Sequence, residues 1–147
     1  MTITATSTSM PALIRAIAAL GAAWNVFGVI QFWGQLSTTP AMLVAKGMTA
    51  AQATLYASLP GWMTIVFAIG VFGGLVGSVL LLIGQRAATT LLGMSLVGYI
   101  ALYIGDIFEG VFAAFGTGQV VVLTIVVAIA AALLLLSLHA DRRGWLR

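Results

Sequence analysis

Four apolar runs, each long enough to cross a lipid bilayer, constrain this chain more than any other feature of its sequence. They lie at residues 11–34, 60–83, 87–108 and 118–138. A helix needs about 20 apolar residues to cross the hydrocarbon core of a bilayer, and backbone groups in lipid must be hydrogen-bonded within their own segment. The sequence therefore predicts a single domain, an all-α integral membrane bundle of four helices.

The composition agrees with the bilayer as the main partner of this chain. Of its 147 residues, 62% are hydrophobic and only 6% are charged, which leaves too little polar surface for a soluble globule. The net charge of +3 comes from basic residues that are scattered or terminal, so no basic stripe for nucleic acid is formed. The absence of cysteine excludes disulfides and thiolate chemistry.

The first residues do not resemble a secretory signal. Residues 1–9 are rich in Ser and Thr and carry no basic side chain, and Arg15 lies inside the first apolar run instead. We expect the first run to remain in the mature protein as a helix, preceded by a frayed tail at residues 1–9.

The positions of the basic residues predict the orientation of the bundle. Arg86 lies in the turn between the second and third runs, and Arg142, Arg143 and Arg147 follow the fourth. Because cytoplasmic loops carry an excess of Lys and Arg, both termini and the Arg86 turn are predicted to be cytoplasmic. The connection at residues 37–59 is then outside.

This external connection carries a helix signal of its own. Thr49, with Gln52 three residues later, matches a capping box, and the segment is predicted to form two short helical pieces hinged at Gly47. A partly ordered loop is the alternative.

Small residues on the second run predict close helix packing. Gly70 and Gly74, and Gly73 and Gly77, form two overlapping small-xxx-small pairs. The neighbour on this face is expected to be another helix of the same chain or a second copy, which makes a homo-oligomer or a larger membrane complex the expected assembly.

Polar residues on the first and third runs are the candidates for a ligand site. On the third run, Tyr99, Tyr103 and Asp106 recur at helical spacing, and Asp106 lies about 30 Å from the Arg86 turn, at the outer interface. The full candidate set is Asn25, Gln31, Tyr99, Tyr103, Asp106 and Glu109. Together these residues predict a polar, aromatic mouth that opens outward.

Simpler interpretations stay open for the same residues. The aromatic side chains are also typical of interfacial anchors, and Asn25 of an amide that joins two helices. Asp106 and Glu109 lie at a helix end where the macrodipole disfavours carboxylates, so they are either solvated or held by a cation, such as Lys46 or a ligand. No metal site is expected, because His139 has too few partners near it.

Several segments resemble a known group of proteins. They are "WNVFG" at residues 24–28, Tyr56 with "LPGW" at residues 59–62, "FAIGVFGGLVGSVLLL" at residues 67–82 and "SLVG" at residues 95–98. This pattern resembles a family of small bacterial four-helix membrane proteins provisionally labelled sugar transporters. The resemblance implies a location in the bacterial inner membrane, and it supplies no site residues.

Two classes of function are consistent with these features. The first is a solute carrier or ligand-binding protein that uses the outer mouth for a small molecule. The alternative is a non-catalytic accessory subunit of a larger membrane complex. An enzyme is not expected, because the chain has no cysteine and its only histidine is near the C-terminus. No cofactor is expected.

Overall fold

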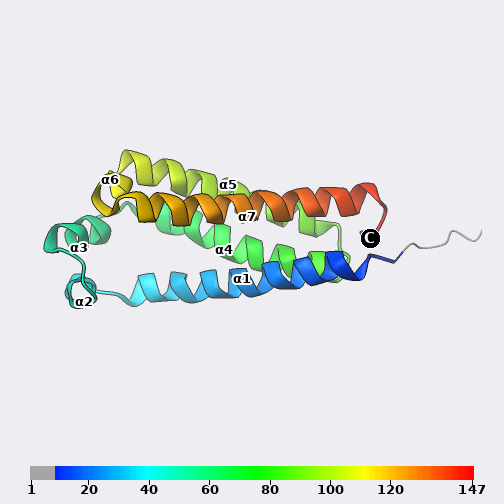
Figure 1. Cartoon of the computed structure of the whole chain (residues 1–147), viewed down its shortest axis with the longest axis horizontal. Helices are drawn as coiled ribbons and strands as arrows, with labels where there is room; N and C mark the ends of the chain where they lie inside the picture. Colours follow the sequence, from blue (N-terminus) through cyan, green and yellow to red (C-terminus); the bar gives the residue numbers. More distant parts are fainter. Residues whose placement is uncertain (1–8) are drawn as a thin grey trace, which may run out of the picture.

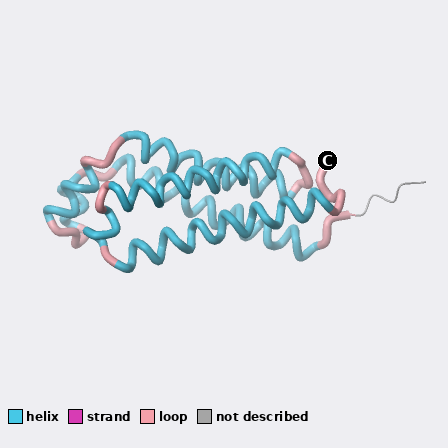
Figure 2. The backbone as a smooth tube through the Cα atoms, turned by 90° about the horizontal axis from the view of Figure 1, so that it is seen from above, coloured by secondary structure: helices cyan, strands magenta, loops and turns pink. Residues whose placement is uncertain are grey.

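Four long helices form the body of the protein. The computed structural model describes residues 9–147, in which no strand occurs. The long helices lie side by side (Figures 1 and 2) and are α1 (Ala12–Ser37), α4 (Gly61–Leu82), α5 (Ala87–Phe108) and α7 (Thr117–Arg142). Each is long and apolar enough to cross a membrane. The predicted all-α, four-helix membrane bundle is confirmed.

The ends of the long helices lie near the predicted ones. The largest difference is at the C-terminal end of α7, which continues to Arg142 rather than ending at residue 138. The tail expected at residues 1–9 lies, apart from Ser9, outside the described residues.

The connection between α1 and α4 contains the two short helices expected there, α2 (Pro40–Ala45) and α3 (Ala50–Ala57). Thr49 and Gln52 make both hydrogen bonds of the capping box at the start of α3. Between the two helices, Gly47 has a φ of +100°, a backbone conformation that side chains other than glycine rarely adopt.

A third short helix was missed by the sequence analysis, which expected only a turn between α5 and α7. It is α6 (Val111–Phe115), and it lies at the same end of the bundle as α2 and α3 (Figure 1). Gly110 and Gly116, both with a φ of +73°, bound it on either side. Five apolar residues are too few to show a helical period, so the sequence pattern could not separate this helix from its neighbours.

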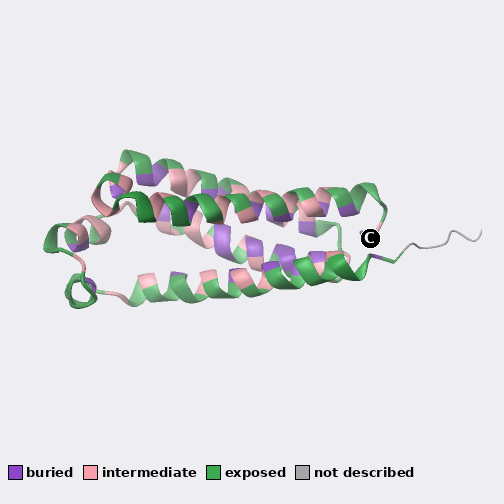
Figure 3. Ribbon diagram, in the orientation of Figure 1, coloured by how far each residue is buried: buried purple, intermediate pink, exposed green. Residues whose placement is uncertain are grey.

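The helices pack in the order α1, α4, α5, α7, with only sparse contact between α1 and α7. Buried residues gather along the inner faces of the helices, whereas their outer faces are exposed (Figure 3). On these outer faces, Leu13, Ile65, Val97 and Leu135 are between 62% and 69% exposed. Large exposed apolar side chains on all four long helices are typical of surfaces that face lipid.

The predicted glycine face of α4 packs inside the chain. A Cβ at Gly70 would lie 2.7 Å from the Tyr99 ring, and one at Gly77 would lie 2.8 Å from Leu92, both on α5. A Cβ at Gly73 would lie 3.2 Å from the backbone oxygen of Leu91. Of the two neighbours expected on this glycine face, the structure shows a helix of the same chain, α5, and the homo-oligomer stays a prediction.

Gly74, the fourth glycine of the pattern, faces α1. A Cβ at this position would collide with the Asn25 side chain. The glycines thus let α4 approach both of its neighbours, and the buried Ser95 hydroxyl of α5 donates a hydrogen bond of 2.6 Å to the Gly70 carbonyl.

Candidate functional site

A cavity of about 440 Å³ lies at the end of the bundle that carries α2, α3 and α6. We call it the outer cavity, and all four long helices contribute to its lining. Its polar lining residues are Gln31, Gln35, Thr38, Lys46, Tyr56, Tyr99, Asp106 and Gln119. The rest of its wall is mainly aliphatic and aromatic.

The polar and apolar parts of the lining separate along the helix axes. On α5, Asp106 lies two turns nearer to the α3 end than Tyr99, and on α7 Gln119 lies two turns nearer to that end than Val126. Two turns correspond to about 10 Å. The cavity therefore has an outer half with charged and amide groups and an inner half lined by apolar side chains such as Phe67 and Val71.

Asp106 is the most informative residue of the outer half. Only 4% of this residue is exposed, and Nε2 of Gln119 donates a hydrogen bond of 3.2 Å to its Oδ2 atom. Among residues 9–147, the Oδ1 atom of Asp106 receives no hydrogen bond. The only fully enclosed side-chain polar atom without a partner in that range is Ser78 Oγ, so Oδ1 is not fully enclosed. Oδ1 therefore keeps some exposure, and the cavity that Asp106 lines is the outer cavity.

Helix α3 lies over the outer end of the cavity. Nε2 of Gln52 donates a hydrogen bond of 2.8 Å to the Ala114 carbonyl of α6, and the Tyr56 ring packs edge-on against Phe115 at 6.3 Å. Burial raises the pKa of the Tyr56 hydroxyl above its ordinary value of 10.0, and the charge of Asp106 raises it further. Tyr56 is thus a neutral hydroxyl over the physiological pH range, close enough to Asp106 to sense its charge.

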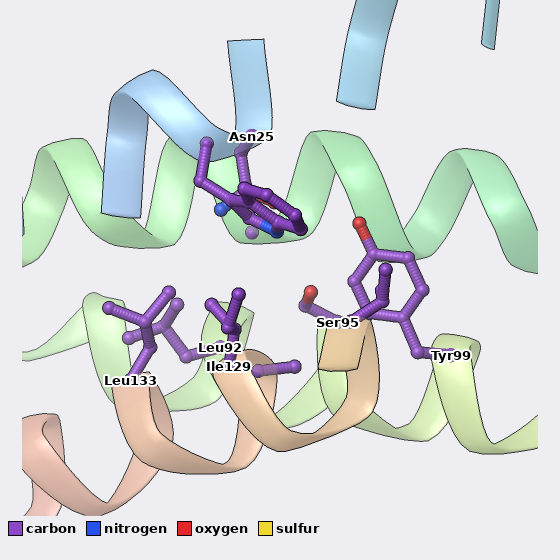
Figure 4. Close-up of a pocket in the computed structure, with 10 residues that line it drawn as sticks. Asn25, Leu92, Ser95, Tyr99, Ile129 and Leu133 are labelled. Atoms are coloured by element: carbon purple, nitrogen blue, oxygen red, sulfur yellow. The ribbon is translucent and has the colours of Figure 1, made fainter. Parts of the chain in front are cut away.

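A second hydroxyl lies at the inner end of the cavity. Tyr99 is 4% exposed, and its hydroxyl points from α5 toward α1 (Figure 4). A Cβ at Gly28 would lie 3.8 Å from this hydroxyl, so the glycine leaves room for it beside α1. No hydrogen-bond partner for the Tyr99 hydroxyl occurs in the described part of the chain.

The structure divides the six predicted site residues into two groups. Gln31, Tyr99 and Asp106 line the outer cavity, and the other three do not. Tyr103 packs edge-on against Phe112 at 4.9 Å, away from the cavity. Glu109 caps the end of α5, outside the cavity lining.

Asn25 belongs to a narrow crevice between α1, α4, α5 and α7 (Figure 4), which adjoins the outer cavity and shares Trp24, Tyr99 and Val126 with it. Its Nδ2 atom donates a hydrogen bond of 2.8 Å to the Gly21 carbonyl, and its side chain fills the space that Gly74 leaves open. The hydrogen bond lies within α1, so this amide contacts α4 by packing against Gly74 and not through a hydrogen bond.

Lys46 also lines the outer cavity, but it does not hold the Asp106 carboxylate. Within residues 9–147, the one ion pair is that between Arg86 and Asp141, at the opposite end of the bundle. The suggested resting ion pair between Lys46 and the carboxylates of α5 is therefore not formed. Lys46 is exposed at the aqueous end of the cavity.

Gln119 is the site residue that sequence reasoning missed. The fourth run contains few polar residues, and a single amide near its start forms no stripe with them. Its position held a usable signal, because a residue in the first turn of α7 must lie at the same membrane depth as the last turn of α5. An amide at that depth is well placed to reach Asp106.

The described residues offer no metal-binding cluster, since no group of three or more His, Cys, Asp or Glu side chains comes together in them. Comparisons of the chain with models of protein families, with curated proteins and with solved structures find no match. The resemblance to provisionally labelled sugar transporters stays a prediction.

Proposed function

We propose that this multi-pass membrane protein binds a small organic solute in the outer cavity, as a carrier or as a ligand-binding protein. The observation that carries this proposal is the Asp106 carboxylate, which lines a cavity inside a membrane-spanning bundle and whose Oδ1 atom has no hydrogen-bond partner among residues 9–147. Ionisable residues within membrane spans are costly to keep and commonly mark a binding site or a pathway.

The size and lining of the cavity support a small-molecule ligand. Ligand sites are commonly clefts of about 300–1,000 Å³ with mostly apolar walls and a few polar groups, and the outer cavity has a volume of about 440 Å³ with a lining of this kind. Polar side chains from α1, α5 and α7 converge on it, as an orienting site requires.

The alternative of an accessory subunit has less support. In that alternative the polar faces and the glycine face of α4 would contact a partner, and the glycine face is covered by α5 and α1 of the same chain.

The proposed location is the bacterial inner membrane, with both termini in the cytoplasm and the outer cavity on the external side. Support comes from Arg86 and the terminal arginines, which lie together at the end of the bundle opposite the cavity. Cysteines placed at Gln85 and Lys46 should react with an impermeant reagent from opposite sides of the membrane. Reaction from the same side would contradict this orientation.

Binding in the outer cavity can be tested by thermal stability of the purified protein in mild detergent with a panel of sugars, amines and quinones. At least one class should raise the melting temperature of the wild-type protein. In Gln31→Trp, the indole ring should fill part of the cavity and abolish the rise in melting temperature. Gln31 lines the cavity and is exposed, so the larger side chain fits without a clash.

The matched control is Ile30→Trp, because Ile30 is also exposed on α1 and does not line the cavity. This variant should keep the ligand-induced rise. If no compound stabilises the wild type, or if Gln31→Trp responds as the wild type does, the proposed function is wrong.

A further inference from the structure

Granted the proposed solute binding, we infer that the ligand is an amphiphilic amine, with its ammonium group at Asp106 and its apolar body in the inner half of the outer cavity. Four features of the cavity support this ligand class.

The first feature is an uncompensated charge. The Asp106 carboxylate is almost fully buried and receives one hydrogen bond from a neutral amide, and no basic group pairs with it in residues 9–147. Burying a carboxylate is expensive unless it is paired. An ammonium group supplies both the missing charge and an N–H donor for Oδ1, whereas the hydroxyls of a sugar supply only the donor.

The second feature is the apolar inner half. Trp24, Phe27, Phe67, Val71 and Val126 line the cavity, and Val126 lies about two helical turns inward of Gln119. The Tyr99 hydroxyl is the polar group at this level. A hydrophilic cation would leave this apolar surface uncovered. A ligand with an apolar body would remove this surface from water, which favours its binding.

The third feature is the sparsely packed wall between α1 and α7. Phe27 on α1 and Val122 on α7 line the cavity and are 54% and 58% exposed. They lie on two helices that have only sparse contact with each other. A wall of exposed apolar side chains with little helix contact suits a ligand that enters from lipid.

The fourth feature is Lys46 at the aqueous end of the same cavity. Its ammonium group is exposed and forms no ion pair in the described residues. A like charge at this end opposes hydrophilic cations that arrive from water, and it leaves the lipid-facing side as the favourable route.

The inference can be tested with three probes that separate the head of the ligand from its body. 4-Phenylbutylamine has both parts, 4-phenylbutanol has the body without the charge, and ethylamine has the charge without the body. We expect the full-length protein in detergent to bind 4-phenylbutylamine at least about tenfold more tightly than either of the other two, as measured by calorimetry.

Asp106→Asn should lower the affinity for 4-phenylbutylamine at least about tenfold and leave that for 4-phenylbutanol unchanged. The unchanged affinity for the alcohol shows that the variant still folds around its cavity. Glu109→Gln is the matched control, because Glu109 lies near the same end of α5 but outside the cavity lining, and it should bind all three probes as the wild type does. Lys46→Ala should strengthen amine binding about two- to threefold by removing a like charge.

The results that overturn this inference differ from those that overturn the proposed function. The ligand class is wrong if 4-phenylbutanol or glucose binds as tightly as 4-phenylbutylamine and Asp106→Asn changes the affinity for none of them. The proposed function would survive this result if Gln31→Trp still abolishes binding. If Lys46→Ala weakens the binding of 4-phenylbutylamine, Lys46 does not repel the ammonium group, and the fourth feature no longer supports an amine. If neither the three probes nor any compound of the panel binds, the proposed function fails as well.

Discussion

The two ends of the bundle are built from the same four helices, but one end is closed and the other encloses a cavity. At the closed end, the Arg86 amide donates to the Arg147 carbonyl at 2.9 Å, and the Arg147 amide donates to the Gly84 carbonyl at 2.8 Å. These bonds tie the C-terminal segment to the turn between α4 and α5. At the other end, α2, α3 and α6 lie over the outer cavity instead.

Side-chain size accounts for much of this difference. Ala18, Ala88 and Ala140 belong to the hydrophobic cluster of the closed end and have no exposed surface, so the helices approach closely there. At the cavity end, the residues that face inward are larger and polar, with Asp106 and Gln119 as the clearest pair. Small apolar residues thus favour a packed end, and polar residues with unused hydrogen-bonding atoms favour an end that takes up a ligand.

The largest effect on stability is expected from Gly98→Ala, because the added methyl group should separate α4 from α5 along their whole contact. A Cβ at Gly98 would lie 2.7 Å from the Val66 carbonyl oxygen and 3.0 Å from the Gly70 amide nitrogen. Both are backbone atoms and cannot move aside, so we expect a loss of about 3 kcal/mol of stability, measured by unfolding in detergent.

Gly93→Ala is the control on the same helix. The nearest atom to a Cβ at Gly93 is 4.0 Å away, which leaves room for the methyl group. This variant should be as stable as the wild type. Equal tolerance of alanine at both positions would show that α4 and α5 do not pack as closely as the structure has them.

A smaller effect is expected from Asn25→Ala, which distinguishes a packing amide from the binding groups of the cavity. The change removes the hydrogen bond to the Gly21 carbonyl and leaves a space opposite Gly74. We expect a loss of about 1–2 kcal/mol of stability.

Calorimetry with 4-phenylbutylamine completes the test of Asn25. The affinity of the protein for 4-phenylbutylamine should not change in Asn25→Ala, because Asn25 does not line the outer cavity. Val26→Ala, at an exposed position next to it, is the control for stability. A loss of affinity without a loss of stability would place Asn25 in the ligand site and remove the distinction between the crevice and the cavity.

The fold could be predicted from the sequence because it depends on the lengths of apolar runs and on the spacing of small residues. Residues 87–108 formed one uninterrupted apolar run, and α5 has those bounds. The glycine pattern predicted a close neighbour, but it could not say which helix that was. Only the three-dimensional packing showed that α5 and α1 cover the glycines.

The candidate site could be predicted only in part. Asp106 was found because a carboxylate in an apolar run is conspicuous, and its helical spacing with Tyr99 put both on one face. Gln119 was missed because an amide at the start of an apolar run is not conspicuous. Its importance depends on a contact across two helices, which a pattern within one helix cannot reveal.

The smallest effect concerns the titration of Tyr56, and it tests whether Asp106 carries the charge that the proposed ligand requires. The pKa of Tyr56 is raised by burial and then by the Asp106 charge. A raised pKa means that the folded protein favours the protonated hydroxyl. Its contribution to stability is complete below pH 10.0, the ordinary pKa, and is lost as the pH rises through the higher pKa of the folded protein.

Asp106→Asn removes the charge of Asp106 and leaves the burial of Tyr56, so the pKa of Tyr56 should fall part of the way toward 10.0. The measurement is the ultraviolet absorbance of tyrosinate against pH, as the difference between each protein and its Tyr56→Phe counterpart. Glu109→Gln should leave this titration where it is. If Asp106→Asn also leaves it unchanged, Asp106 is uncharged or too far from Tyr56 to act on it, and an ammonium ligand loses its counter-ion.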